Sequence, residues 1–401
     1  MIVKKINLVF PLVSLMLFLA GCGSAVQSSA ESKEADASGT SINEAVSTGI
    51  TAVRGVWLTN VDSKVLNSKE GIVEAVQACR EMGFNTIFPV VWNKGYTLYP
   101  SATMKREFGI EIDSSLAGRD PLRELIDEAH KFNIRVIPWF EFGFSASFKA
   151  NGGHLLAAKP HWKAIDRQGN LVTKNGFEWM NGFHPEVQEF MLSLIREVVT
   201  NYDVDGVQGD DRLPAMPSES GYDPYTVGLY KAARNGKEPP ADHYEADWLQ
   251  FRADLMTEFG EKLFKLVKSI KPEVIVSLSP SIYPFAKEEY LQDWPEWARR
   301  GTVELLCPQV YRRSIEPYIQ TLHSDFSNIP KGKEHIYYPG ILIKLGTYYP
   351  EPEFLVQMIE ENRKKGIAGE VFFFYEGLKN FKDIFKTRIY PDKVDFPKLT
   401  K

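Results

Sequence analysis

The sequence contains few cysteines and no metal-binding or redox cysteine motif. Its 401 residues include only Cys22, Cys79 and Cys307, without a Cys-x-x-Cys pair or a Cys/His cluster. Structural zinc sites and dithiol redox centres depend on such spacings, so neither is expected. Cys79 falls in a helical pattern and Cys307 in an apolar strand pattern. The two could pair, but buried free thiols are the simpler interpretation.

Several signatures of catalysis and of nucleic-acid binding are also missing. The seven histidines are scattered, with no His-Glu-x-x-His sequence, and there is no Gly-x-Ser-x-Gly elbow. No glycine-rich phosphate loop follows an early apolar run. These absences argue against metal hydrolases, serine hydrolases and dinucleotide enzymes, so we expect no metal and no cofactor. A formal net charge of −5 is not that of a polycation, and nucleic acid is not an expected partner.

The first 22 residues have the pattern of a bacterial lipoprotein signal. Lys4-Lys5 precedes an apolar segment over 6–18 that is too short to span a membrane comfortably, and Leu19-Ala-Gly-Cys22 forms a lipobox. We expect lipidation of Cys22, which would hold the protein on the extracytoplasmic side of a membrane. Gly23 after the cysteine is compatible with the outer membrane of a Gram-negative cell. The alternative is an ordinary signal peptide with an incidental cysteine.

Beyond the signal, the chain divides into a tether and one large domain. Residues 23–50 are rich in Ser, Ala, Glu and Gly and contain no aromatic residue, which predicts a disordered tether. From there to residue 401, short apolar runs alternate with longer amphipathic stretches. The predicted strands are 54–60, 86–92, 135–142, 206–211, 274–280, 303–311, 336–343 and 370–376. The predicted helices are 68–82, 120–132, 185–201, 246–270, 289–300, 315–322, 352–365 and 379–386.

This alternation predicts an α/β fold. Strand–helix alternation indicates parallel strands with crossover helices, and eight such units in the segment 51–401 favour a single (β/α)8 TIM barrel. The longest links follow strands, over 93–119, 143–184 and 212–245. In a barrel these links emerge at the C-terminal mouth, where they would wall a cleft suited to a polymer.

The strongest candidate site ends the fourth predicted strand, in the segment 205–211. Because side chains alternate along a strand, Gln208 and Asp210 should face the barrel interior if Val207 and Gly209 face the helices. Asp210 would then lie at the mouth and Asp211 on its rim. A carboxylate there is costly unless it is solvated, paired or used. We predict a catalytic role for at least one of them; the alternative is an Asp pair that braces the loop.

The third strand supplies a possible partner. Trp139 and Glu141 share one face by the same alternation, and Glu141 beside aromatic residues could have a raised pKa and act as an acid. A structural Glu is the equal alternative. Two carboxyl groups on a barrel rim are what glycosidic hydrolysis needs, because one protonates the leaving oxygen and the other acts as nucleophile or base.

Other mouth residues are candidates for substrate binding, and the inward-facing Gln208 is one of them. Gln309 and Tyr311 share a face at the end of the sixth strand and could hold sugar hydroxyl or N-acetyl groups. Glu376 at the tip of the eighth strand is a weaker candidate. Four tryptophans could stack on sugar rings, although packing is the more common role of any one of them. They are Trp92, Trp139, Trp162 and Trp179.

Several of these segments together resemble the glycosyl-hydrolase-like family 10 domain, a bacterial barrel family. The matching pieces lie at 54–59, 98–101, 184–211, 279–280 and 308–311. The resemblance implies hydrolysis of a glycosidic bond, and some relatives look like enzymes acting on cell-wall glycan. It carries over best to Asp210 and Asp211, and next to Gln309 and Tyr311.

This chain departs from the family pattern at three positions. Glu141 stands where many members have Asn, Arg212 where many have an aromatic residue, and Trp92 where Arg is familiar.

From the lipobox, the barrel pattern and the resemblance together, we expect a lipid-anchored glycoside hydrolase acting on a polysaccharide, with peptidoglycan strands as one candidate. The alternative is a non-catalytic glycan-binding or wall-tethering lipoprotein on a hydrolase fold.

Overall fold

The computed structural model describes residues 50–399. The predicted lipidation site Cys22 and nearly all of the predicted tether over 23–50 lie outside these residues. Within the described range, no helix combines the length and the apolar character needed to cross a bilayer.

Parallel strands form two sheets. The first has the order β13-β14-β1-β2-β5 and the second the order β12-β11-β10-β6. In that order, the strands of the first sheet are Gly340–Leu342, Gly369–Phe373, Val53–Leu58, Thr86–Pro89 and Arg135–Val136. The strands of the second sheet, in its order, are Leu305–Leu306, Ile275–Leu278, Gly206–Gly209 and Trp139–Phe140. Every predicted strand therefore overlaps an observed one, and the predicted 135–142 run contains both β5 and β6.

Isolated parallel bridges connect the edges of the two sheets. Val90 pairs with Trp139 on one side, and on the other Leu306 pairs with Tyr337 and Gln309 with Gly340. The strands thus form two open sheets and not one closed barrel. The edges of the two sheets nevertheless meet in the order that the predicted barrel requires. The α/β class with parallel strands is confirmed.

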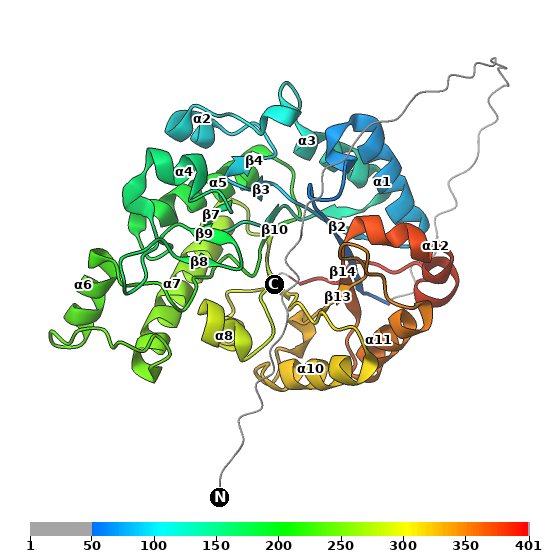
Figure 1. Cartoon of the computed structure of the whole chain (residues 1–401). Coiled ribbons are helices and arrows are strands. Elements are labelled where there is room, and N and C mark those ends of the chain that lie inside the picture. The colour runs from blue at the N-terminus through cyan, green and yellow to red at the C-terminus, as the bar shows by residue number, and fades with distance from the viewer. Residues whose placement is uncertain (1–49, 400–401) are drawn as a thin grey trace, which may run out of the picture.

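Helices lie around the strands, as Figure 1 shows. Those that match predicted helices are α1 (Lys69–Glu81), α3 (Pro121–Ala129), α5 (Pro185–Asn201), α7 (Ala246–Ile270), α9 (Trp294–Arg300), α10 (Ile315–Ser327) and α11 (Pro352–Lys364). Caps explain several starts: the side chains of Ser68 and Asp120 accept hydrogen bonds from backbone N–H groups in the first turn.

Two predicted helices were wrong in detail. The stretch 289–300 is divided into α8 (Phe285–Tyr290) and α9, because Leu291 has φ 59° and ends the first helix in a left-handed conformation. The stretch 379–386 is not one helix. It passes from a 3-10 segment (Tyr375–Phe381) through α12 (Lys382–Ile384) into a π-helical turn (Phe385–Ile389).

The long strand-to-helix links carry secondary structure that the sequence patterns did not predict. The link after β2 forms the hairpin β3 (Trp92–Asn93) and β4 (Tyr96–Thr97), followed by α2 (Ala102–Phe108). The link after β6 forms the antiparallel sheet β7-β9-β8 (Ser145–Phe148, Phe177–Trp179, Thr173–Lys174) and α4 (Gly153–Ala158). The link after β10 contains α6 (Pro224–Ala233). These elements are too short to show a clear hydrophobic period.

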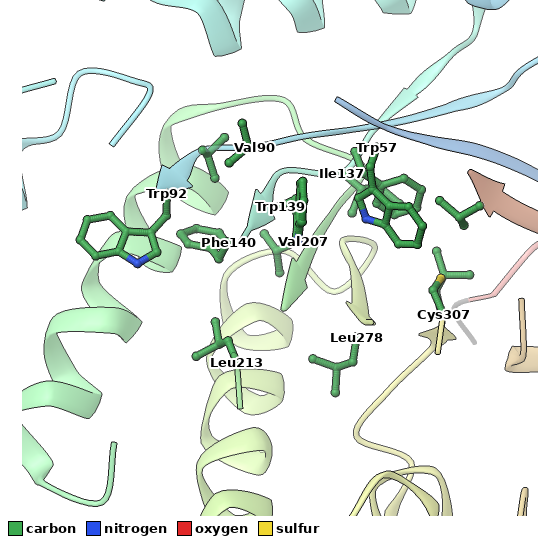
Figure 2. Close-up of a cluster of buried hydrophobic side chains, with 14 of the residues drawn as sticks. Trp57, Val90, Trp92, Ile137, Trp139, Phe140, Val207, Leu213, Leu278 and Cys307 are labelled. Carbon is green, nitrogen blue, oxygen red and sulfur yellow. The ribbon is translucent and has the colours of Figure 1, made fainter. Parts of the chain in front are cut away.

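Aromatic side chains fill the space between the two sheets. The rings of Trp57, Trp139 and Phe373 have centroid separations of 6.3 to 6.4 Å. Figure 2 shows Trp57 and Trp139 projecting toward each other from β1 and β6. Gln208 crosses this layer, accepting from Trp57 Nε1 at 2.6 Å and donating to Ser277 Oγ at 2.9 Å. The parity prediction for Gln208 is therefore confirmed.

The two described cysteines do not form a disulfide. Cys79 and Cys307 are both buried free thiols. Cys79 is a residue of α1 whose side chain lies in the hydrophobic core. Cys307 directly follows β12 and lies in the part of the core that Figure 2 shows. The simpler interpretation of the sequence is confirmed.

Candidate active site

A glycine brings the ends of β6 and β10 into contact. Gly143 has φ 48°, and a Cβ at this position would lie 2.0 Å from the carbonyl oxygen of Arg212. That close approach lets Phe144 N donate to Arg212 O at 3.0 Å and Arg212 Nε donate to Glu141 O at 2.9 Å. The residues that follow the third and fourth strands are thereby held side by side.

Asp210 is buried and accepts three hydrogen bonds. Its side chain is 2% exposed. Gln309 Nε2 and the backbone N–H of Asp211 each donate to Oδ1 at 2.7 Å, and Arg212 Nη2 donates to Oδ2 at 3.1 Å. All three groups are donors, so their arrangement fits the ionised carboxylate.

Arg212 lies between the carboxylates and a pair of aromatic rings. Its side chain is 11% exposed, with Nη1 2.7 Å from Asp211 Oδ1, an ion pair without hydrogen-bond geometry, and Nη2 3.9 Å from Glu141 Oε1. Its guanidinium carbon lies 4.6 Å from the ring centre of Phe177 and 5.8 Å from that of Phe142. We call Glu141, Asp210 and Asp211, with Arg212, the acid cluster.

Glu141 has fewer donors than Asp210. Its Oε2 accepts from Asn93 Nδ2 at 2.6 Å, and the same nitrogen lies 3.0 Å from Asn60 Oδ1. Burial raises the pKa of Glu141 to about 7, with a further rise from the Asp211 carboxylate, while Arg212 and Asn93 oppose the shift. Near neutral pH this carboxyl group is therefore half protonated and able to donate a proton.

The pKa values of Asp210 and Tyr311 are raised as well. Burial, and then the charge of Asp211, raise the pKa of Asp210, and Arg212 opposes them. Burial and the charge of Asp210 raise the pKa of Tyr311, so its phenol stays protonated. The Tyr311 ring packs 5.5 Å from that of Phe373. Perturbed groups gathered at the carboxyl ends of parallel strands are typical of an active site.

A family model described as Glycosyl hydrolase-like 10 matches residues 52–343 of this chain. The chain belongs to this family. The matched segment runs from β1 to the end of β13 and contains the whole acid cluster. It also contains Asn60, Asn93, Gln309 and Tyr311.

Curated relatives carry names consistent with this family. "Glycosyl hydrolase DigH" of Escherichia coli strain K12 is 26% identical over 349 residues, covering 77% of this chain and 76% of the relative. The DigH of strain CFT073 is 27% identical over 282 residues, and there the match spans 62% of the relative's length. "Glycosyl hydrolase YngK" of Bacillus subtilis is 23% identical over 398 residues, covering 86% of this chain and 73% of that protein.

Solved structures show where this fold recurs. The PgaB (BpsB) glycoside hydrolase domain from Bordetella bronchiseptica has a TM-score of 0.62 at 11% identity, covering 84% of this chain and 99% of that one. Alpha-L-fucosidase isoenzyme 2 from Paenibacillus thiaminolyticus has a TM-score of 0.60 at 17% identity, covering 84% and 50%. This family member thus shares its fold with glycoside hydrolases of the TIM-barrel type.

The structure separates the sequence-predicted site residues into two groups. Glu141, Asp210, Asp211 and Gln309 come together in one hydrogen-bonded and ion-paired group. Glu376 follows β14 but makes other contacts, since Ser63 Oγ donates to its Oε1 at 2.9 Å.

Two predicted substrate contacts require correction. Gln208 is fully buried, with both side-chain polar atoms bonded to Trp57 and Ser277, so it supports the floor rather than a ligand. Trp92 is also fully buried, donates from Nε1 to Gly143 O at 2.9 Å and packs against Phe190 of α5. In Figure 2 its indole points away from Trp57 and Trp139.

The remaining predicted stacking residues are buried as well. Trp139, Trp162 and Trp179 are each at most 3% exposed, so the packing alternative applies to all of them. Trp139 nevertheless lies at the floor of the mouth, and among the described residues no acceptor bonds its Nε1. A buried indole donor of this kind is available to an oxygen of a ligand.

Sequence reasoning missed three residues that shape the site. Asn93 donates to Glu141, Asn60 accepts from the same Asn93 nitrogen, and Phe177 covers Arg212 from the β8–β9 hairpin. Asn93 carried a signal, because it is a polar residue one position beyond a predicted apolar strand. Phe177 carried none, because its position depends on how a distant hairpin folds over the mouth.

A separate surface hollow of about 530 Å³ lies between α11 and the π-helical turn Phe385–Ile389. Its lining includes Arg363, Lys364 and Arg388, and none of its lining residues belongs to the acid cluster. Among residues 50–399, no group of three or more His, Cys, Asp or Glu side chains is placed to hold a metal ion. The acid cluster therefore remains the candidate active site.

Proposed function

We propose that this protein is a glycoside hydrolase whose reacting carboxyl groups are Asp210 and Glu141. The observation that carries the proposal is their convergence on one guanidinium nitrogen. Arg212 Nη2 lies 3.1 Å from Asp210 Oδ2 and 3.9 Å from Glu141 Oε1. The two oxygens are thus at most about 7 Å apart, an upper limit that overlaps the roughly 5–9.5 Å separating paired carboxylates in glycosidases.

The hydrogen bonds suggest how the two groups divide the work. Burial and the Asp211 charge raise the pKa of Asp210, but its three N–H donors favour the anion, and on this geometry we assign it the role of nucleophile, base or charge stabiliser. Glu141 has one close donor and a pKa of about 7, so it is suited to protonate the leaving oxygen. A protonated acid beside an ionised one is the arrangement that glycosidic cleavage requires.

The proposed substrate is a polysaccharide outside the cytoplasm, with peptidoglycan glycan strands as the candidate. Support comes from the family, from the lipobox that ends at Cys22 and from the long loops around the mouth. Lipid on Cys22 would keep the domain at a membrane surface next to the cell wall. In this proposal the two parallel sheets act as one (β/α)8 barrel, bridged at both edges.

A second function is supported by the ion pairs of Arg212. The guanidinium already pairs with Asp210 and Asp211, and many family members are expected to have an aromatic residue at that position. A site whose acids are permanently neutralised would bind glycan without cleaving it. Arg212 does not neutralise the cluster completely, because three carboxyl groups face one cation.

The test is product release from defined glycans. Wild type, Asp210→Asn and Glu141→Gln are incubated with peptide-free glycan strands, intact peptidoglycan and other bacterial polysaccharides, and products are identified by mass spectrometry. Loss of a general acid or its partner should lower the rate by about 100-fold or more. Glu353→Gln is the matched control, because this exposed carboxylate of α11 pairs with Arg388 and lies outside the acid cluster.

Retention of near wild-type cleavage by folded Asp210→Asn would refute the assignment. If wild type releases no product from any glycan but binds one of them, the binding function replaces the hydrolase proposal.

A further inference from the structure

Exposed aromatic side chains are few, and two of them lie beside the mouth. Within residues 50–399, the large aromatic side chains with high exposure are Tyr225, Tyr244 and Phe285, at 39%, 44% and 36%. Tyr244 lies in the link after α6, and Phe285 is the first residue of α8. Both links leave the carboxyl ends of strands, β10 and β11, so both rings belong to the end of the fold that carries the acid cluster.

Contacts connect these two rings to the acid cluster. The Tyr244 hydroxyl donates to Glu289 Oε1 at 2.8 Å. The Phe285 ring lies 6.0 Å from the ring of Tyr290, which follows Glu289 in the chain. The Tyr290 hydroxyl accepts from Asn175 Nδ2 at 2.8 Å, at the turn of the hairpin that covers Arg212. Tyr290 is close enough to the cluster for the charges of Asp211 and Arg212 to act on the pKa of its phenol.

Carboxylates lie next to the rings. Glu289 and Glu219 both bond Lys174 Nζ, at 2.7 and 2.9 Å, and their side chains remain 26% and 38% exposed. Sugars present an apolar face of C–H groups and an edge of hydroxyl groups. An exposed ring beside exposed carboxylate oxygens matches both features, because the ring takes the apolar face and the oxygens accept from hydroxyls.

We infer that Tyr244 and Phe285 form a sugar-stacking subsite that holds the glycan beyond the bond that is cleaved at Asp210. The inference rests on the proposed function for its ligand and deepens it, since a second subsite at the rim favours a polymer over a single sugar. The ligand is the continuation of the same glycan chain, because the rings and the acid cluster are joined through Tyr290 and the β8–β9 hairpin. Tyr244 and Phe285 thus take the role predicted for the buried tryptophans.

The experiment measures binding separately from cleavage. The full chain carrying Asp210→Asn is examined by affinity electrophoresis in gels containing peptide-free peptidoglycan glycan strands, and by calorimetry with the disaccharide unit of those strands. Tyr244→Ala and Phe285→Ala should each weaken strand binding by about tenfold, as expected for one stacking contact, and leave disaccharide binding unchanged. Tyr225→Ala is the matched control, because its ring has a similar exposure but packs 5.2 Å from His184 instead of contacting Glu289 or Tyr290.

The conservative variants Tyr244→Phe and Phe285→Tyr should restore strand binding, which separates stacking from misfolding. Equal retardation of the alanine variants and of the parent Asp210→Asn chain would overturn the inference. Failure of the glycan strands to retard that parent chain would overturn it as well. The hydrolase proposal fails in a different way: wild type would bind glycan strands through these rings but would never cleave them.

Discussion

Glu141 should make the stability of this protein depend on pH in a direction opposite to that of a typical carboxylate. Its pKa in the folded state is about 7, against an ordinary 4.5, because the side chain is mostly buried beside Asp211. Between these values the folded state keeps a proton that the unfolded state has lost. Stability therefore falls as the pH rises through this window, and the full cost is reached above pH 7.

The magnitude follows from the size of the shift. A difference of about 2.5 pKa units corresponds to about 3 kcal/mol, and this is an upper bound because 14% of the side chain still contacts solvent. Glu141→Gln keeps an oxygen that can accept from Asn93 and removes the buried charge. Relative to wild type, the Gln variant should gain up to about 3 kcal/mol of unfolding free energy between pH 4.5 and pH 8.

The assay is urea unfolding of both proteins at several pH values across this range, with equal m-values as the condition for comparing them. Buried acids on which Glu141 does not act, such as Asp325, contribute equally to both proteins and cancel in the difference, whereas Asp210, whose pKa the Glu141 charge raises, adds to the difference in the same direction. Phe285→Ala is the control, because it removes no titratable group and its difference from wild type should stay constant. A pH-independent difference between wild type and Glu141→Gln, or a difference of opposite sign, would refute the reasoning.

Three other substitutions or reagents test the neighbouring structure. Arg212→Gln leaves three carboxyl groups without their cation, so its unfolding free energy should drop by about 3–5 kcal/mol at pH 8 and by less at pH 5; a pH-independent loss would contradict this. Gln208→Leu strands the Trp57 indole donor and should cost about 1–3 kcal/mol in urea unfolding, whereas an unchanged midpoint would show that the bond is dispensable. Burial raises the pKa of Cys79 to about 12 and also raises that of Cys307, so neither thiol should react with a thiol reagent until the protein unfolds; rapid labelling of the native chain would argue against their burial.

Much of the framework could be predicted from the sequence, because it depends on local patterns. Apolar runs of strand length alternate with amphipathic stretches, and each run overlaps an observed strand. Caps such as Asp120 mark helix starts within the sequence itself. The inward orientation of Gln208 and Asp210 follows from the two-residue period of a strand and needs no knowledge of the rest of the chain.

Whether each tryptophan contacts a ligand or packs in the core could not be predicted in this way. Trp92 ends an apolar run and could face a ligand or a helix, and only the packing of α5 against it decides for the helix. The same holds for the exposed rings of Tyr244 and Phe285, which lie in links whose course over the surface has no periodic signal.

The parallel α/β framework, the family and the placement of Asp210 at the end of a central strand follow from the order of residues along the chain. The surroundings of that carboxylate follow from how distant segments fold onto one another. Arg212 meets Glu141 because Gly143 allows two loop backbones to touch, and Phe177 holds the guanidinium down from a hairpin formed about 35 residues earlier in the chain. Such contacts depend on long-range packing, so neighbouring residues in the sequence carry little information about them, and they set the pKa of the acid cluster.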